Sequence, residues 1–200
     1  MSRRPATSLS SGPYLHRLKA HQEVRGQLRQ ELLALPVPAF NRLVARLLLQ
    51  CGYAAVQVLA EAQGSADLLA SSSGGLSSTL TLVQAKQYSV PVSRRFVDEL
   101  RGAMLRHQAS QGLLLTTSTF FGPAHRAAAL QCPLPVRLVD WEELLDLLLA
   151  HSLGVSAFRE GHFALDREFF IALLQEQASE PDAPTSHSNY SSCAACGGRW

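Results

Sequence analysis

The sequence lacks the features that mark membrane and secreted proteins. Its longest leucine-rich run, Leu144 to Leu149, is far too short to cross a bilayer and is flanked by charged residues. Residues 1–13 are polar and basic without an apolar core segment, so we expect no secretory signal. These absences predict a soluble protein in the reducing cytoplasm, with no membrane partner.

Strong charge of one sign is also missing. Eighteen basic and sixteen acidic side chains leave a formal net charge of only +2. This balance excludes a highly basic protein that coats nucleic acid. A local basic patch can still bind DNA, because affinity depends on the phosphates neutralised at the contact surface. The net charge therefore neither indicates nor excludes a DNA partner.

Cysteine is scarce, and its four positions form two groups. Cys51, on the apolar face of a predicted helix, and Cys132 are expected to be buried or half-buried thiols rather than a disulfide. Cys193 and Cys196 form a Cys-x-x-Cys-Gly pattern, which supplies half of a tetrahedral zinc site. His187 or a second chain could add ligands, but the sequence shows no complete zinc set.

Several catalytic signatures are absent as well. The sequence has no Gly-x-Ser-x-Gly nucleophile motif, and no histidine stands in a recognisable triad context. It also has no phosphate-binding loop and no Rossmann glycine pattern. These absences argue against a serine or cysteine hydrolase and against a nucleotide-driven enzyme.

The 200 residues, of which 46% are hydrophobic, are enough for one substantial core. We expect four segments along the chain: a disordered start and helical lead-in over 1–35, a main domain over 36–155, a C-terminal appendix over 156–178, and a flexible linker with the Cys-x-x-Cys tail over 179–200.

The hydrophobic pattern of the main domain predicts alternating helices and strands. Apolar residues from Phe40 recur at i, i+3, i+4, i+7, i+8 and i+11, which predicts an amphipathic helix ended by Gly52. The Ser- and Gly-rich stretch 72–78 is expected to be a loop between strands. The remaining predicted elements are strands over 54–60, 67–71, 79–86, 112–118 and 136–139 and helices over 93–107, 123–130 and 141–151.

Polar residues mark the end of one of these strands. Alternate side chains share a face, so Gln84 and Lys86 should point the same way, towards Asp67 at the start of the preceding strand. Asp67, Gln84 and the backbone carbonyl of Ala85 offer oxygen ligands for a hard divalent cation. Lys86 can orient a water or stabilise developing negative charge, which suits phosphodiester hydrolysis. A turn aspartate and a solvated lysine are the plain alternatives.

These residues belong to an ordered series of segments that resembles the Mrr-type restriction endonucleases. This family is a branch of the PD-(D/E)XK nuclease superfamily in which glutamine replaces the second acid. The resemblance covers roughly residues 35–155 and implies an α/β fold: a restriction-endonuclease-like three-layer core with a central mixed β-sheet flanked by helices. The matching segments are Pro38–Leu48, Gly52-Tyr53, Gly64–Ala70, Val83–Tyr88, Val97–Met104, Gly112–Phe120, Arg137–Asp140 and the leucine-rich helix that follows.

The resemblance implies a Mg²⁺- or Mn²⁺-dependent endodeoxyribonuclease that restricts foreign or modified DNA. Asp67, Gln84 and Lys86 would be its catalytic residues. Asn41 stands where the family commonly carries glutamate, which implies a weaker or altered metal site. A catalytically weak or silent DNA-binding module and an interaction protein without nucleic acid are the alternatives. The oligomeric state stays open, with a homodimer as one option.

Residues after the third strand are candidates for DNA contact. Tyr88 could stack on a sugar or base, or cover the sheet edge. Arg94, Arg95 and Arg101 lie on the following helix, where they could contact phosphates. Acidic residues on the same helix dilute this charge, so a solvated face is the alternative.

Overall fold

The computed structural model describes residues 12–59, 67–74, 77–157 and 163–176. The first half contains helices α1 (Gly12–Ala34) and α2 (Val37–Gln50) and strands β1 (Ala55–Val58), β2 (Leu68–Gly74) and β3 (Ser77–Lys86). The second half contains α3 (Arg94–Arg106), β4 (Gln111–Thr116), α4 (Gly122–Ala128), β5 (Val136–Val139), α5 (Trp141–Ala150), β6 (Val155–Ala157), β7 (Phe163–Leu165) and α6 (Arg167–Gln175).

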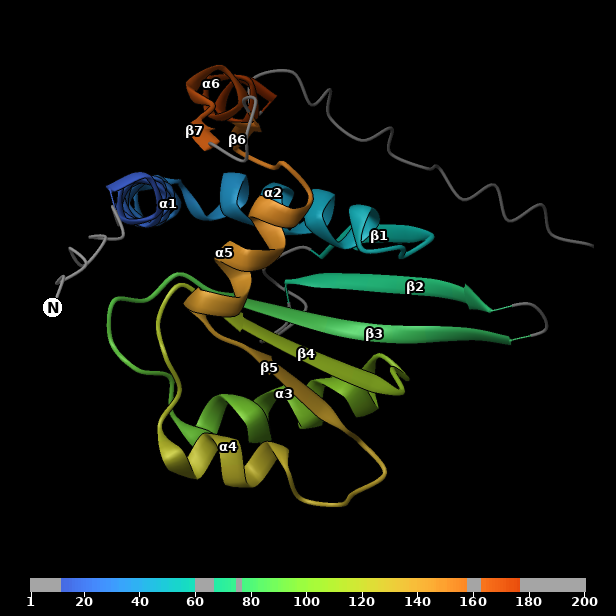
Figure 1. Ribbon diagram of the computed structural model, residues 1–200. Coiled ribbons are helices and arrows are strands. Elements are labelled where there is room, and N and C mark those ends of the chain that lie inside the picture. Colours follow the sequence, from blue (N-terminus) through green and yellow to red (C-terminus); the bar gives the residue numbers. More distant parts are fainter. Residues whose placement is uncertain (1–11, 60–66, 75–76, 158–162, 177–200) are drawn as a thin grey trace, which may run out of the picture.

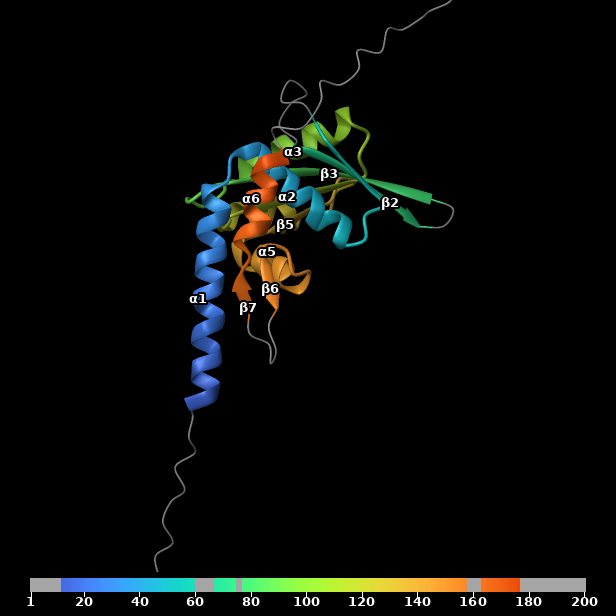
Figure 2. The same cartoon turned by 90° about the horizontal axis from the view of Figure 1, so that it is seen from above.

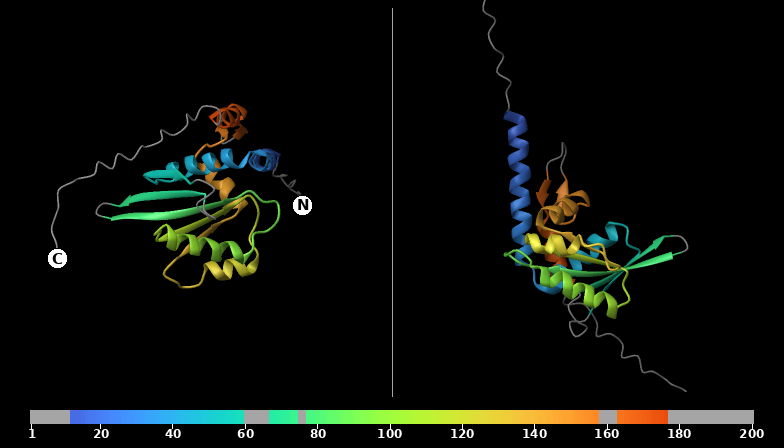
Figure 3. Two further views of the ribbon diagram at one scale, coloured as in Figure 1. Left: turned by 180° about the vertical axis from the view of Figure 1, so that it is seen from behind. Right: turned by 90° about the horizontal axis from the view of Figure 1, so that it is seen from below.

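A five-stranded mixed sheet forms the centre of the molecule, in the order β1-β2-β3-β4-β5. The β1–β2 and β2–β3 pairs are antiparallel, whereas β3–β4 and β4–β5 are parallel. Helices α1, α2 and α5 lie on one side of the sheet, and α3 and α4 lie on the other (Figure 1). The same two helical layers are seen from behind and from below in Figure 3. The predicted three-layer α/β core with a mixed sheet is confirmed.

Each face of the sheet packs against its own helical layer. Val83 and Ala85 on β3 belong to the core beneath α1, α2 and α5, together with Leu115 on β4. Leu82 and Leu114 belong to a second core with α3 and α4. Strand β4 is therefore buried on both faces, as its continuous apolar sequence predicts.

The predicted loop over residues 72–78 is wrong, because β2 and β3 continue through most of it. Ser72 pairs with Thr79, and Gly74 pairs with Ser77. The prediction failed because serine and glycine are common in turns, whereas a strand is held by backbone hydrogen bonds that do not require apolar side chains. The two strands therefore form a long antiparallel hairpin beside the core.

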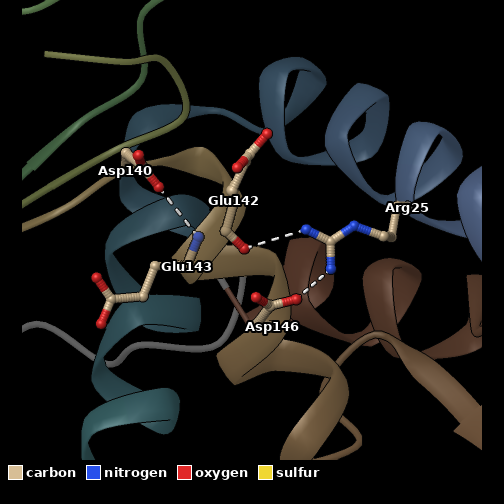
Figure 4. Close-up of polar contacts among 5 residues, drawn as sticks. All are labelled: Arg25, Asp140, Glu142, Glu143 and Asp146. Atoms are coloured by element: carbon tan, nitrogen blue, oxygen red, sulfur yellow. Dashed lines mark hydrogen bonds and ion pairs between the residues drawn. The ribbon is translucent and has the colours of Figure 1, made fainter.

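The C-terminal half of α1 is docked on the main core. Leu28 and Leu32 are buried in the same core as α2, and Arg25 forms an ion pair with Asp146 on α5 (Figure 4). Arg25 also donates to the backbone oxygen of Glu142 at 3.3 Å. The other half of α1 extends beyond the rest of the molecule (Figure 2). The predicted helical lead-in thus contributes to the core through its last turns.

The C-terminal elements pack on the same side of the sheet. Phe170 and Leu173 of α6 belong to the same core cluster as the buried residues of α2, and Arg42 donates to the backbone oxygen of Leu173 at 2.9 Å. Strand β6 spans the boundary predicted between residues 155 and 156. The predicted disordered start, residues 1–12, lies outside the described residues except for Gly12, which begins α1, and the predicted tail over 179–200 lies outside them entirely. Within the described chain, no helix is long and apolar enough to span a membrane.

Candidate active site

The hairpin register brings Asp67 to β3. Leu68 and Val83 form the last pair of the hairpin, and Asp67 lies one residue before this pair. The Asp67 N–H donates to the Val83 carbonyl at 3.0 Å, and the Ala85 N–H donates to Oδ2 of Asp67 at 2.7 Å. The structure therefore brings together Asp67 and the Gln84–Lys86 segment, and it fixes one carboxylate oxygen by a charge-assisted hydrogen bond.

The backbone carbonyl of Ala85 points towards the same edge as the Asp67 carboxylate. The N–H and C=O of one strand residue point to the same neighbouring strand, and this direction alternates along the chain. Lys86 accepts from Thr117 N–H, next to β4, whereas Val83 accepts from Asp67 N–H, next to β2. Ala85 therefore directs its carbonyl towards β2, which makes it available as an oxygen ligand beside Asp67.

Gln84 and Lys86 lie on the α3 side of the sheet. Gln84 is completely buried, whereas Lys86 is partly exposed at the end of β3. Nζ of Lys86 lies 5.6 Å from the ring centroid of Phe96 on α3. This cation–π contact limits the freedom of the ammonium group and keeps a positive charge at the strand end.

Tyr88 continues this aromatic surface. Its ring packs edge-to-face against Phe96, with the two centroids 5.8 Å apart. Its backbone oxygen accepts from the Thr117 hydroxyl at 2.9 Å, which ties the segment after β3 to the end of β4. The predicted contact of Tyr88 with DNA stays a prediction, and the ring also serves as a support for α3.

The carboxyl ends of β4 and β5 complete this edge of the sheet. Thr116 and Ser118 are buried, and the Thr116 hydroxyl accepts from Ser118 N–H at 3.1 Å. The Ser118 carbonyl accepts from Trp141 N–H at 2.9 Å, which joins this edge to the start of α5. Asp140 caps α5 by accepting from Glu143 N–H at 3.1 Å (Figure 4). These contacts hold the loops around the candidate site in place.

Asn41 is buried near the start of α2, with 8% of its surface exposed. Its Oδ1 has no hydrogen-bond partner among the described residues. The start of α2 lies at the Lys86 end of the sheet, because the Gln87 amide donates to the backbone oxygens of Leu32 and Leu35 at 2.5 and 2.6 Å. A buried neutral amide, Asn41, thus stands where the family commonly has glutamate, on the helix that begins at the Lys86 end of the sheet.

The candidate ligands at this site fit a hard cation, although only one of them carries a negative charge. The ligands that the sequence suggested are one carboxylate, one amide oxygen and one backbone carbonyl, from Asp67, Gln84 and Ala85. All three are oxygen donors of the kind that Mg²⁺ and Mn²⁺ accept. Within residues 12–59, 67–74, 77–157 and 163–176 there is no group of three His, Cys, Asp or Glu side chains suited to a metal. Asp67 therefore supplies the single carboxylate of this set.

The arginines of α3 divide into two kinds. Arg94 and Arg95 are exposed and form ion pairs one turn apart with Asp98 and Glu99, at 3.1 and 2.6 Å. Arg101 instead donates to the backbone oxygens of Ala127 at 2.9 Å and Leu134 at 3.2 Å. These two hydrogen bonds favour a structural role for Arg101. DNA contact by Arg94 and Arg95 stays a prediction.

The two described cysteines differ from expectation in one respect. Both are free thiols, and Cys132 is partly buried and donates to the Leu134 carbonyl at 3.1 Å. Cys51 is exposed, so the prediction that it is buried or half-buried is wrong. It follows the last turn of α2, where the chain turns away from the core at Gly52, which has a positive φ of 96°. The predicted zinc ligands Cys193 and Cys196 lie outside the described residues.

Sequence reasoning missed a contact of Cys51. Its Sγ lies 3.6 Å from Nε2 of His151, which follows α5 as Cys51 follows α2. A pair that is 100 residues apart in the chain gives no local signal. Only the shared position just after an apolar helix could have drawn attention to it.

Comparison with solved structures shows where this fold occurs. The DNA modification-dependent restriction endonuclease AspBHI matches with a TM-score of 0.55 and 18% identity over 90% of this chain. The MspJI restriction endonuclease in complex with a 27-mer oligonucleotide matches with a TM-score of 0.47, 19% identity and 88% coverage. This chain spans 45% of the AspBHI chain and 37% of the MspJI chain, so less than half of either. The likeness to AspBHI shows the fold that the sequence predicted.

Two further comparisons complete the assignment. A third structure, titled as the protein of unknown function AF1548, matches with a TM-score of 0.49 and 20% identity, over 70% of this chain and 78% of that one. A search of curated proteins found no match. The family model described as restriction endonuclease, Mrr_cat, matches residues 32–148, which include Asp67, Gln84 and Lys86. The chain therefore belongs to the Mrr catalytic-domain family of restriction endonucleases.

Proposed function

We propose that the protein is a divalent-metal-dependent DNA endonuclease that hydrolyses phosphodiester bonds at the carboxyl end of β3. The observation that carries this proposal is the hydrogen bond of 2.7 Å from Ala85 N–H to the Asp67 carboxylate. It places a carboxylate beside the Gln84–Lys86 segment within a chain of the restriction endonuclease family.

Asp67, Gln84 and the carbonyl of Ala85 would hold Mg²⁺ or Mn²⁺. When bound, such a cation supplies Lewis-acid polarisation of the scissile phosphate. The Ala85 N–H keeps the Asp67 carboxylate in place, so that no reorganisation is required when substrate binds. Gln84 is completely buried beside this carboxylate, so its side chain is held in the sheet.

Lys86 would act directly on the reacting groups. Its ammonium group has three donors, which can orient the attacking water and stabilise the negative charge that grows on the phosphate. The Phe96 ring holds this charge near the strand end. The work of Lys86 therefore falls in the transition state rather than in the folding of the sheet.

The proposed substrate is double-stranded DNA that is foreign or modified. AspBHI, which has the same fold, is described as modification-dependent. Its chain is more than twice as long as the part that this protein matches. The proposed setting is the cytoplasm, where such DNA is met, and a homodimer would allow both strands to be cut.

A silent DNA-binding module is the second candidate function. The buried neutral Asn41 and the single carboxylate of the donor set favour it, because each lowers the negative charge available to a cation. Such a module would bind DNA and leave it intact with every divalent metal.

Cleavage of supercoiled plasmid tests the proposal. We expect nicking or cutting with Mg²⁺ or Mn²⁺ and none in excess chelator. Lys86→Ala should slow cleavage by a factor of about 10²–10³, because one preorganised charge is lost from the transition state. Arg106→Ala is the matched control: it removes one exposed positive charge from the last turn of α3 and should leave the rate unchanged.

Three results would contradict the proposal. Cleavage that persists in chelator would exclude the metal mechanism. A Lys86→Ala variant that cuts at the wild-type rate would remove Lys86 from the site. Wild-type protein that binds DNA but cuts with no divalent metal would favour the silent module.

A further inference from the structure

Arg29 on α1 and Trp141 at the start of α5 form a stacked pair beside a cavity. The guanidinium carbon of Arg29 lies 4.4 Å from the centroid of the Trp141 ring. Both side chains are only partly buried, so a ligand in the cavity can reach them. The volume of the cavity is about 390 Å³, which lies within the range of about 300–1,000 Å³ for ligand sites. It is also lined by Gln22, Arg25, Gly26 and Glu142.

Arg29 differs from the other arginine of this cavity because it has no anionic partner. Arg25, four residues earlier and therefore on the same face of α1, forms an ion pair with Asp146 and donates to the backbone oxygen of Glu142 (Figure 4). Arg29 forms no hydrogen bond or ion pair within the part of the chain that the structure describes, and its Nε is buried. A guanidinium group is always charged and has five donors. Arg29 can therefore bind an anion that the described chain does not supply.

The Trp141 ring holds this guanidinium in place without neutralising it. Stacking on an aromatic face leaves the N–H donors at the edge of the guanidinium plane available, and this fork of donors matches the oxygens of a phosphate. Glu142 lines the same cavity, and these two described side chains, Glu142 and Arg29, form no ion pair with each other. The Glu142 carboxylate should oppose an anion in the cavity, so its removal provides a test of the sign of the ligand charge.

The stacked pair lies at the same edge of the sheet as the candidate active site. Trp141 N–H donates to the Ser118 carbonyl at 2.9 Å, just beyond the end of β4. Three residues after Arg29, a backbone oxygen of α1 accepts from the Gln87 amide at 2.5 Å. Gln87 directly follows Lys86 in the chain. A DNA strand whose scissile phosphate lies at Lys86 can therefore continue along this edge to Arg29.

We propose that Arg29, held by Trp141, binds a phosphate of the DNA backbone beside the cleavage site. The inference rests on DNA as the substrate in the proposed function, but it does not require that the DNA is cut. Phosphate contacts fix the position and orientation of a duplex on a protein and carry no sequence information. Arg29 is therefore a residue that positions DNA of any sequence over the carboxyl end of β3.

Affinity for a labelled duplex, measured without divalent metal at several salt concentrations, tests the contact. Arg29→Ala should weaken binding by about tenfold, because a hydrogen bond between charged groups is lost. The slope of log affinity against log salt should become shallower by about 0.9, because one phosphate is no longer neutralised. Arg29→Lys should keep the slope, since it keeps the charge. A role of Arg29 in stability alone would not change this slope.

Two further variants complete the binding measurement. Glu142→Gln should strengthen duplex binding by up to about fivefold, because it removes a charge that opposes the phosphate. Arg106→Ala is the matched control. It removes an exposed arginine in the last turn of α3, shortly before β4 begins at the opposite end of the sheet, and should leave affinity and slope unchanged.

The fluorescence of Trp141 gives a second readout of the same site. Trp200, the other tryptophan of the chain, is replaced by phenylalanine, so that the emission comes from Trp141 alone. Duplex should change this emission, because the stacked guanidinium gains a phosphate partner, and the change should be lost when Arg29→Ala is added. Inorganic phosphate at the same concentration of phosphate groups should have little effect, because a single phosphate lacks the other contacts of a duplex.

Three results would overturn the inference. An Arg29→Ala variant with the affinity and salt slope of the wild type would remove Arg29 from the DNA interface and leave the proposed cleavage untouched. A change in Trp141 emission with inorganic phosphate but none with duplex would assign the cavity to a free anion. Wild-type protein that binds no duplex would overturn both this inference and the proposed function.

Discussion

The two faces of the β2–β3 hairpin have different roles: one carries the candidate active site, and the other packs in the apolar core. Gln84, two residues after Leu82 of the α3 core, lies on the α3 face, and the candidate site consists of its strand end and the Asp67 carboxylate. Leu68 and Val83, their immediate neighbours, are completely buried in the core on the other face. Because side chains alternate along a strand, the sheet can carry a polar site without breaking the apolar core. Substitutions at neighbouring positions should therefore change the cleavage rate and the free energy of unfolding separately.

The largest expected effect is on the chemistry. Asp67→Asn removes the only carboxylate of the donor set but keeps an oxygen that can accept from Ala85 N–H. We expect the cleavage rate to fall by a factor of about 10³, with little change in melting temperature, because a neutral ligand holds a hard cation poorly. Plasmid cleavage over a range of Mn²⁺ concentrations measures this loss. A variant restored to the wild-type rate by more metal would show that Asp67 tunes affinity rather than the reaction.

The second-largest effect is expected on the stability of the fold, at Leu68, which follows Asp67. Leu68→Ala should lower the free energy of unfolding by about 2–5 kcal/mol, because it leaves a cavity beneath α2. Cleavage per folded molecule, measured well below the melting temperature, should be unchanged. Denaturant unfolding together with the plasmid assay gives both numbers. A Leu68→Ala variant that is stable but inactive would show that the two faces of the hairpin are not independent.

The fold was largely predictable because it depends on local patterns. The apolar spacing of α2 and the continuous apolar run of β4 predict their burial directly. The hairpin tip was misread because Ser72 to Ser78 has the composition of a loop, while the pairing of Ser72 with Thr79 depends on backbone groups that composition does not report. The docking of α1 through Arg25 was not predictable, because its ion-pair partner Asp146 is far along the chain.

The candidate site was predictable only in part. Alternation along β3 places Gln84 and Lys86 on one face, and the register with β2 brings Asp67 to them. The roles of the α3 arginines could not be separated from sequence, because Arg101 finds its acceptors, Ala127 and Leu134, on other elements. Contacts between distant segments carry no local signature, and the Cys51–His151 pair is the clearest case.

A smaller effect is expected at Asn41, where a substitution should change both stability and metal binding. Asn41→Glu adds a carboxylate at the buried position where the family commonly has glutamate. Without metal we expect a lower melting temperature, because the added charge is buried without a partner. With Mn²⁺ the melting temperature should rise more than in the wild type, and half-maximal cleavage should need on the order of tenfold less metal. Thermal melts with and without Mn²⁺ measure both changes, and Asn41→Gln is the neutral control. Equal metal responses in the two variants would show that position 41 does not face the cation.

The smallest expected effect lies on α3, where exposed and hydrogen-bonded arginines can be compared on one helix. Arg94→Ala/Arg95→Ala removes two exposed charges whose ion pairs with Asp98 and Glu99 contribute little, so stability should change by less than about 1 kcal/mol. If both contact phosphates, DNA affinity should weaken similarly on unrelated sequences, and the slope of log affinity against log salt should fall by about 1.8.

Arg101→Ala should give the reverse, a loss of about 1–3 kcal/mol of stability with an unchanged salt slope, because two backbone carbonyls lose their donor. Titrations of labelled duplex at several salt concentrations, with melts of each variant, measure the two effects separately. An unchanged slope in the double variant would assign Arg94 and Arg95 to the solvated face, and a reduced slope in Arg101→Ala would return that residue to the DNA interface.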